Sequence, residues 1–401
     1  MTTDGNLTKN RVKFAGSWYE LDDFAQRHPG GEGFINIFNG RDVTHAFRSY
    51  HPQFTDNRIR SVLHKAKDSE KLFKEEEPNS ITGLDIQTTN IAVKEHEKAF
   101  KELQKEVLHA LGGHHKSKGN LCFFVKCFSI LAIAICLEAM QWVYGFTLLR
   151  SALHGFVIAL IGLNIMHDAN HGAASLNPKI NFALSLVEDW IGGSYIHWRH
   201  HHVVLHHIHT NTEADPDVII RPILRIHPKQ QPNQINYYQH LYVWPLIANM
   251  ILGNILVEPF DLVFGTFKNE QKGKTGNIDY RFPESTKQER MLSLILRVPF
   301  YLRFIILPLV AAPELNTVLC MYAYVAAGSL FLGSIFLLSH NYSNVKFHPG
   351  NGDNQNISFL ELQVETSSNW GGWFALQLCG GLNCKCLAIG TQDYSSNVVL
   401  P

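Results

Sequence analysis

Apolar and polar positions divide the chain into two unlike parts. Residues 1–120 are polar and rich in Lys and Glu, whereas residues 121–149 contain only Lys126 and Glu138 as charged side chains. Because a bilayer span needs about 20 largely apolar residues, this run predicts a membrane-spanning helix. Further apolar runs that predict spans are 151–166, 240–264, 291–313 and 315–339.

Two segments join the polar part to the first predicted span. Residues 65–89 are charged, contain Pro and Gly and show no apolar period, which predicts a linker. Phe100, Leu103, Val107 and Leu111 then share one helical face, opposite Lys and Glu. This pattern is typical of a helix in the membrane interface, and equally of a helix packed on the N-terminal domain.

Charge and cysteine content narrow the class of protein. A formal net charge of zero argues against a nucleic-acid partner. The seven cysteines lie mostly inside predicted spans without a paired framework, which fits a reducing, cytosol-facing protein. The first 30 residues carry no apolar signal-peptide core. We therefore expect the N-terminal domain to stay in the cytosol, with the first span acting as the insertion signal.

The stretch WYELDDFAQRHPGGEGFINIFNGRDVTHAFRSYHP, residues 18–52, contains two separated histidines. His28 precedes Pro-Gly-Gly, which must turn sharply, and His51 follows 23 residues later. Two neutral imidazoles on opposite walls of an apolar pocket can hold a haem iron axially and leave no open site for oxygen. Over about residues 9–80 the chain resembles the cytochrome b5 domain, which implies that His28 and His51 bind haem b.

Other histidines are clustered at the ends of apolar runs. His167 and His171 are four residues apart, so on a helix they share one face and can point at one metal. His202 and His206 repeat that spacing, with His207 adjacent. Four more histidines in the same stretch leave the choice of ligands open: His197, His200, His201 and His209.

A single histidine, His340, ends another apolar run. Taken alone, such a residue is more often a hydrogen-bonded helix end than a metal ligand. Imidazole alone does not choose among zinc, iron, copper and nickel, but at least six grouped histidines exceed the four ligands of a zinc site. They suit two iron atoms. Beside an electron-carrying haem, such a site implies oxygen activation and removal of hydrogen from an unactivated C–H bond, and its membrane location suggests a lipid.

The motifs HDANH, HVVLHH with the trailing TN and DPD, SHN and QVETSSNWGGW resemble the membrane fatty acid desaturases. With the haem domain, they resemble the front-end desaturases, which insert a double bond between an existing one and the carboxyl end of a polyunsaturated acyl chain. The resemblance covers residues 9–383. It implies these metal ligands: His167, His171, His202, His206, His207 and His340. By analogy with other metal sites, we expect four polar residues to orient the imidazoles: Asp168, Asn170, Asn211 and Asp215.

The family's third histidine box, usually Gln-x-x-His-His, is expected shortly after 380-GGLN-383. Residues 384–401 read CKCLAIGTQDYSSNVVLP instead, and no histidine follows His348. His348 lies among turn residues in a loop and is a poor substitute for the missing box. Cys384 and Cys386 are two residues apart, so on an extended segment their side chains would point the same way, and we do not expect them to replace it. We therefore expect an incomplete metal site. The tail is a retained intron, an error in the gene structure or a genuine isoform.

The predicted fold class is a small α+β haem-binding domain at 9–80, a linker and interfacial helix at 81–120, and an all-α membrane domain of about four transmembrane helices plus interfacial helices at 121–383. Residues 384–401 form an aberrant tail.

The resemblance implies a haem-fused diiron desaturase of an acyl-lipid or acyl-CoA substrate that reduces O2 to water. Its electrons would come from an NADH-dependent haem reductase. It implies a multi-pass protein of the endoplasmic reticulum whose haem domain and histidine boxes face the cytosol. Two alternatives remain: a sphingolipid long-chain-base desaturase, and a non-catalytic membrane-anchored haem electron carrier. Without the third box we expect little or no turnover.

Overall fold

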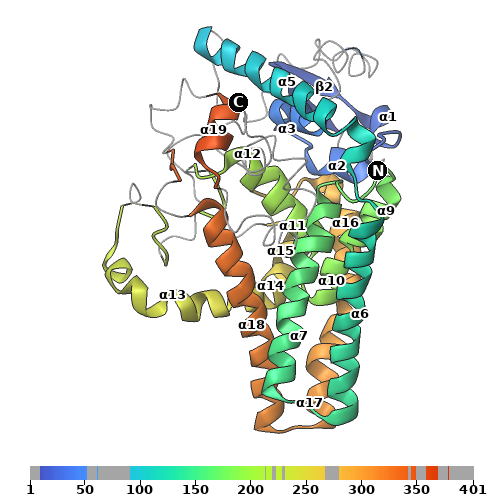
Figure 1. Ribbon diagram of the computed structural model, residues 1–401, viewed down its shortest axis with the longest axis vertical. Coiled ribbons are helices and arrows are strands. Elements are labelled where there is room, and N and C mark those ends of the chain that lie inside the picture. The colour runs from blue at the N-terminus through green and yellow to red at the C-terminus, as the bar shows by residue number, and fades with distance from the viewer. Residues whose placement is uncertain are drawn as a thin grey trace, which may run out of the picture.

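A small domain of strands and short helices lies at one end of a long helical bundle (Figure 1). The computed structural model describes residues 10–51, 61, 91–212, 214–218, 223–227, 231–266, 280–341, 345–348, 358–368 and 378. The predicted tail at 384–401 and the predicted linker at 65–89 lie outside these residues. The predicted fold class, an α+β domain followed by an all-α membrane domain, is confirmed.

The N-terminal domain is built on a three-stranded sheet of order β2–β1–β3. Strand β1 is antiparallel to β2 and parallel to β3. Val12 and Phe14 alternate into the core, as the two-residue period of a strand requires. The elements are β1 (Arg11–Phe14), β2 (Ser17–Glu20), α1 (Asp22–Ala25), α2 (Glu32–Ile37), β3 (Arg41–Asp42) and α3 (Thr44–Tyr50).

Four helices in the described residues are long and apolar enough to cross a membrane: His114–Tyr144, Leu148–Asn170, Glu284–Ala311 and Leu315–His340. Side chains such as Leu121 and Phe128 on the first helix remain exposed, as expected where lipid covers the surface. The spans comprise η1 (His114–Ser117), α6 (Leu121–Tyr144), α7 (Leu148–Ile161), η2 (Gly162–Met166), α8 (His167–Asn170), η5 (Glu284–Thr286), α16 (Lys287–Tyr301), η6 (Leu302–Ile306), α17 (Leu307–Ala311) and α18 (Leu315–His340).

Small residues let α7 and α18 approach closely. A Cβ atom at Gly155 would lie 2.0 Å from the carbonyl oxygen of Tyr324, and one at Gly328 would lie 2.9 Å from the carbonyl oxygen of Gly155. Such contacts between backbones are a common basis of helix association in membranes. Because α7 leads to His167 and α18 ends at His340, this packing also sets the distance between two histidine clusters.

The predicted span at 240–264 is bent rather than straight. Gln234–Ala248 and Met250–Phe264 meet at 52°, and α13 lies across the bundle (Figure 1). Pro245 lies inside α13, and its carbonyl accepts a hydrogen bond from the Asn249 side chain, so the backbone ladder is interrupted near the bend. The elements are η4 (Gln234–Tyr238), α13 (Gln239–Ala248), α14 (Met250–Leu256) and α15 (Glu258–Phe264).

Short helices join the bundle to the N-terminal domain. They are α9 (Pro178–Ser185), α10 (Val187–Ile191), α11 (Tyr195–Trp198), η3 (Arg199–His206), α12 (His207–His209) and α19 (Phe359–Glu365). Phe14 and Ile37 of the N-terminal domain belong to the same buried core as Tyr195, Val204 and Phe282 of the helical part. The two parts are therefore packed together through a shared apolar core.

Helix α5 (Ile91–Ala110) also packs on protein. The Phe100 ring lies 6.0 Å from the Phe359 ring, and the Gln104 side chain donates to the carbonyl oxygen of Arg48. This face of α5 therefore contacts α3 and α19, consistent with the expectation of a helix packed on the N-terminal domain.

Candidate haem and metal sites

His28 and His51 face one another across the N-terminal domain. His28 follows α1 in the sharp turn at Pro29, and His51 ends α3. A side chain at position 30 would push the imidazole aside, because a Cβ atom on Gly30 would lie 2.8 Å from Cε1 of His28. Nδ1 of His28 lies 3.0 Å from the carbonyl oxygen of Gly31, and Nδ1 of His51 lies 2.9 Å from that of Phe47. With Nδ1–H donating in both rings, Nε2 carries the lone pair that can bind iron.

The separation of the two rings fits an axial pair. Their centroids lie 6.1 Å apart. Two metal–nitrogen bonds of about 2 Å, plus about 1 Å for each ring, add up to about 6 Å. Burial lowers the pKa of His28 and lowers that of His51 to about 4, so both rings are neutral at pH 7 and suited to bind metal. The two histidines therefore fit a haem.

A cavity of about 450 Å³ lies between these rings. Its apolar walls include Phe24, Phe34 and Phe47, which suit the faces of a porphyrin. The cavity does not belong to the N-terminal domain alone, because His171 and Gly172 of the helical part also line it.

Four histidines lie close together beside this cavity, of which His171 is one of its lining residues. One ligand atom each of His167, His171 and His202 lies within 4.8 Å of the others. Nε2 of His202 lies 3.0 Å from Nε2 of His207. Two nitrogens bound to one metal at about 2 Å lie about 3 Å apart, so this spacing fits ligands of a common ion. We call His167, His171, His202 and His207 the four-histidine cluster.

Burial disfavours the charged form of three of these four rings. It lowers the pKa values of His171, His202 and His207 well below their ordinary range, and neighbouring imidazoles lower them further. In a neutral imidazole one ring nitrogen carries no hydrogen, and its lone pair can bind a metal ion.

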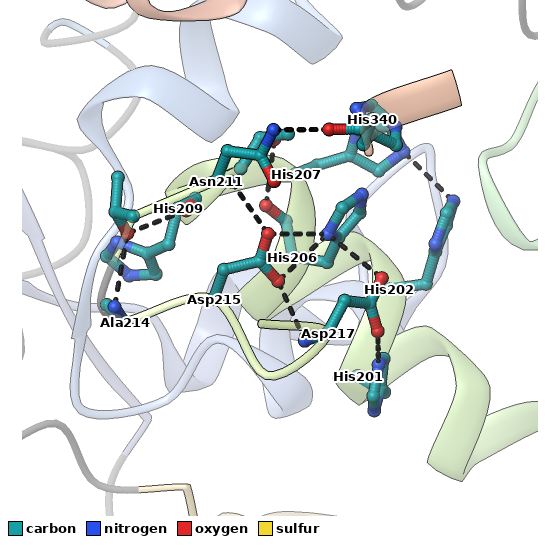
Figure 2. A network of polar contacts seen from close by, with 12 residues as sticks. His201, His202, His206, His207, His209, Asn211, Ala214, Asp215, Asp217 and His340 are labelled. Atoms are coloured by element: carbon teal, nitrogen blue, oxygen red, sulfur yellow. Dashed lines mark hydrogen bonds and ion pairs between the residues drawn. The ribbon is translucent and has the colours of Figure 1, made fainter. Parts of the chain in front are cut away.

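His206 and His340 form a second group (Figure 2), which we call the His206 pair. Their ring centroids lie 4.8 Å apart. Nδ1 of His206 donates to Asp215 at 3.0 Å and lies 3.1 Å from an Asp217 oxygen, while Nδ1 of His340 donates to the carbonyl oxygen of Thr366 at 3.0 Å. Burial disfavours protonation of His206, but the two carboxylates outweigh it and raise its pKa to about 9. These contacts turn Nε2 of both rings toward a possible metal.

The local helix geometry explains which histidines meet. Residues Arg199–His206 form a π-helix, in which each turn is longer than an α-helical turn. His202 and His207, five residues apart, therefore meet, while His206 is directed to Asp215. The rings of His202 and His206, four residues apart, also stack with centroids 5.3 Å apart. The i, i+5 contact between His202 and His207 therefore adds to the predicted spacing, and a joint role of His202 and His206 at a metal stays a prediction.

The four polar residues expected to orient imidazoles are used differently. Asp168 contacts Nδ1 of His167 at 3.3 Å, and Asp215 holds His206. Asn211 acts one step away, because its backbone N–H donates to Asp215 and its side chain donates to the carbonyl oxygen of His340. Asn170 instead accepts a hydrogen bond from Arg199.

The remaining histidines of 197–209 have other contacts. His197 lies 3.5 Å from Glu258 and 3.4 Å from Asp261, and His201 lies 2.5 Å from Asp217. His200 is buried against Arg41 of the N-terminal domain at 3.0 Å. His197, His200 and His201 therefore have polar partners outside the four-histidine cluster, and the choice of metal ligands stays a prediction.

Three residues at the site were missed by the sequence reasoning. The Trp198 ring lies 4.3 Å from that of His202 and 5.3 Å from that of His167. Asp217 shares His206 with Asp215, and its position in the DPD motif was an available signal. Tyr50 reaches His171 from the N-terminal domain, and no pattern in the sequence indicates that contact.

Residues 140–385, more than half of the chain, match the sequence profile described as Fatty acid desaturase. The chain belongs to the fatty acid desaturase family. Residues 12–75 of this desaturase match a second profile, the Cytochrome b5-like Heme/Steroid binding domain, which agrees with the haem-binding geometry of His28 and His51.

Similar proteins span most of the chain. The desaturase is 36% identical to an acyl-lipid (7-3)-desaturase of Rebecca salina over 92% of this chain and 77% of that protein. It is 33% identical to an acyl-lipid (7-3)-desaturase of Diacronema lutheri, over 91% and 76%. It is 28% identical to a probable Delta(5) fatty acid desaturase C of Dictyostelium discoideum, over 93% and 80%.

Proposed function

We propose that the chain is a front-end acyl desaturase that inserts a cis double bond into a polyunsaturated acyl chain, with electrons supplied through its own haem domain. One observation carries this proposal: His51 and His171 line the same cavity, so the haem site and the four-histidine cluster are neighbours. If the haem domain did not pass electrons to the membrane domain, there would be no need for the two sites to lie next to each other.

The residues have distinct tasks in this reaction. His28 and His51 hold haem b, and the four-histidine cluster and the His206 pair hold non-haem iron. When bound, the two irons activate O2 so that two hydrogens are removed from the acyl chain. Asp168, Asp215 and the Thr366 carbonyl fix the orientation of metal-binding rings. Burial of His171 and His206 excludes water from the ligands.

The substrate class follows from the relatives' names, which support an acyl-lipid substrate over a sphingolipid long-chain base. An NADH-dependent haem reductase is the electron source we propose, in the endoplasmic reticulum. The N-terminal domain lies at the end of the bundle where α12, the helix that begins at His207, also lies (Figure 1), which supports placing the haem domain and the histidine clusters together on the cytosolic side.

The His206 pair is the weaker half of the metal site. The described residues supply four histidines to one centre and two to the other, and no histidine follows His348 in the sequence. We propose that the iron at the His206 pair is poorly held in this 401-residue form and that turnover is low. This observation also favours a second candidate function, a membrane-anchored haem protein that passes electrons to other enzymes.

Expression in a host fed polyunsaturated acids tests the proposal. We expect a new front-end double bond in lipids from a version in which Gln-x-x-His-His replaces residues after Asn383, and little or none from the 401-residue form. Equal product from both forms would refute the loss of activity. A long-chain base as the only product would favour the sphingolipid alternative.

Metal content separates the desaturase from the electron carrier. The desaturase with the third box is expected to bind two non-haem irons per haem, and the 401-residue form fewer. A normal haem spectrum with no non-haem iron in either form would support the electron carrier.

A further inference from the structure

Tyr50 connects the haem site to the four-histidine cluster. It is the residue directly before His51, and both line the cavity between the two parts of the chain. Its hydroxyl oxygen lies 3.4 Å from Nδ1 of His171. One side chain of the N-terminal domain therefore contacts a proposed metal ligand of the membrane domain.

The Tyr50 hydroxyl contacts Nδ1 of His171, the ring nitrogen that does not bind the metal when Nε2 does. Nε2 of His171 has no hydrogen-bond partner among the described residues, and the ring is buried. If Nε2 binds the metal, Nδ1 carries hydrogen and donates to the Tyr50 oxygen. Metal-binding histidines depend on such a partner for tautomer and orientation. His206 and His340 have theirs within the membrane domain, whereas His171 takes its partner from the haem domain.

The position of Tyr50 is itself fixed from both sides. Its ring lies 5.8 Å from that of Phe34, and the Arg199 guanidinium lies 4.7 Å from the centre of the Phe34 ring. Arg199 also donates to Asn170, the residue before His171. Burial raises the pKa of Tyr50, so its hydroxyl keeps its proton at physiological pH. The Tyr50–His171 contact thus completes a closed set of contacts that runs through Phe34 and Arg199 and joins the N-terminal domain to the four-histidine cluster.

We infer that Tyr50 is a positioning residue that orients His171 and completes the path His51–Tyr50–His171, by which electrons pass from the haem to the four-histidine cluster. The inference rests on the proposed roles of His51 and His171. With haem held by His28 and His51 and iron held by the four-histidine cluster, each transfer would move one electron, so that the haem iron would be oxidised and a non-haem iron reduced by one unit. The tyrosine hydroxyl keeps its proton, and two transfers supply the pair of electrons that one double bond requires besides the substrate's own.

The orienting role is tested with Tyr50→Phe, which keeps the ring and removes the hydroxyl. Tyr301→Phe is the matched control, since the Tyr301 hydroxyl bonds at 2.7 Å to the carbonyl oxygen of Ile255 away from both clusters. Haem-loaded protein freed of other metal is titrated with Co²⁺, followed by its visible ligand-field bands. We expect Tyr50→Phe to bind Co²⁺ about tenfold more weakly with an unchanged haem spectrum, and Tyr301→Phe to match the parent.

The variant His171→Ala separates failure of the proposed metal site from failure of the proposed role of Tyr50. If His171→Ala loses Co²⁺ binding while Tyr50→Phe binds Co²⁺ normally, the role of Tyr50 is overturned and the metal site stands. If it binds Co²⁺ as tightly as the parent, the proposed ligand set is wrong and the inference falls with it. Loss of haem from Tyr50→Phe would also overturn the inference, because the hydroxyl would then serve the haem pocket.

The electron path has a separate readout. Iron-loaded protein with reduced haem and oxidised non-haem iron is followed without O2 or acyl substrate, and the rate of haem oxidation is measured from its absorbance. Tyr50→Phe is expected to slow this single transfer about tenfold relative to Tyr301→Phe, which is the lower end of the loss in metal affinity or activity that follows when a metal ligand loses its hydrogen-bond partner. Equal rates in the two variants would overturn the path.

Discussion

At the scale of the residue, a histidine's role here depends on the atom that contacts its second ring nitrogen. Nδ1 of His206 faces Asp215, and Nδ1 of His340 faces a backbone carbonyl, so both rings present Nε2 to the site. His200, also buried, is instead committed to Arg41. Sequence spacing alone does not separate these cases, because the deciding oxygen or guanidinium comes from elsewhere in the chain.

Asp215→Asn tests this principle at the His206 pair. The change keeps the shape of the side chain but removes the charge that makes His206 strongly basic, so metal affinity at this pair is expected to fall about 10-fold to 100-fold. Titration of metal-depleted protein that carries the third box would measure it. Asp217→Asn is the control, because Asp217 is more exposed and divides its contacts between His206 and His201. A larger loss from Asp217→Asn than from Asp215→Asn would contradict the assignment.

At the scale of the element, the apolar runs predicted the spans well, and the local helix type escaped prediction. Four of the five apolar runs correspond to single helices that are long and apolar enough to cross a membrane, because length and hydropathy decide whether a segment can span the bilayer. The π-helix at Arg199–His206 was not predictable, because the spacing of the histidines was interpreted with the period of an α-helix. The longer turn brings His202 and His207 into contact, which an α-helical period does not predict. The bend near Asn249 was likewise missed, although Pro245 was a visible signal.

The site was predictable in part for the same reason. The sequence grouped His167 with His171, because both lie near one helix end, and the structure places them together. It could not place Tyr50 beside His171, since that contact depends on how two parts of the chain that are distant in sequence pack together. Long-range contacts of this kind leave no periodic pattern in the sequence.

Gly155→Val tests the close packing of α7 against α18. The added side chain would overlap the backbone of Tyr324, so the helices must separate, at a cost of about 1–3 kcal/mol. We expect a lower melting temperature in detergent and weaker metal binding, because α7 leads through η2 to His167 and α18 ends at His340. Gly253→Ala is the control: a Cβ atom there meets nothing within 4 Å, so stability is expected to stay the same or rise. An unchanged melting temperature for Gly155→Val would contradict the close approach.

At the scale of the whole molecule, the haem domain is fixed against the membrane domain by contacts on several sides. Phe34 packs under Arg199, Arg41 reaches His200, and the Ser285 hydroxyl donates to the carbonyl oxygen of Asn36. These polar contacts surround the shared apolar core. The haem site therefore has a defined position relative to the four-histidine cluster, which suits electron transfer within one chain.

Acid is expected to loosen this docking through His45. Its ring stacks on that of Phe359 in α19, with centroids 4.5 Å apart and planes 12° from parallel. Burial, together with the nearby charges of Arg48 and His209, lowers the pKa of His45 to about 3. When the domains separate, the ring returns toward its ordinary value of about 6.5.

The sign of the effect follows from which state binds the proton. Between pH 6.5 and 3 the separated state is protonated at His45 and the docked state is not, so docking is full above this window and weakens as pH falls through it. At pH 5 the loss is about 2 kcal/mol, from about 1.5 pH units at 1.36 kcal/mol each. Hydrogen exchange of α3 and α19, corrected for the intrinsic pH dependence, should therefore rise at pH 5 relative to pH 7.5. His45→Phe keeps a ring against Phe359 without a titrating group, so it should reduce this rise; an equal rise in His45→Phe would place the pH response elsewhere.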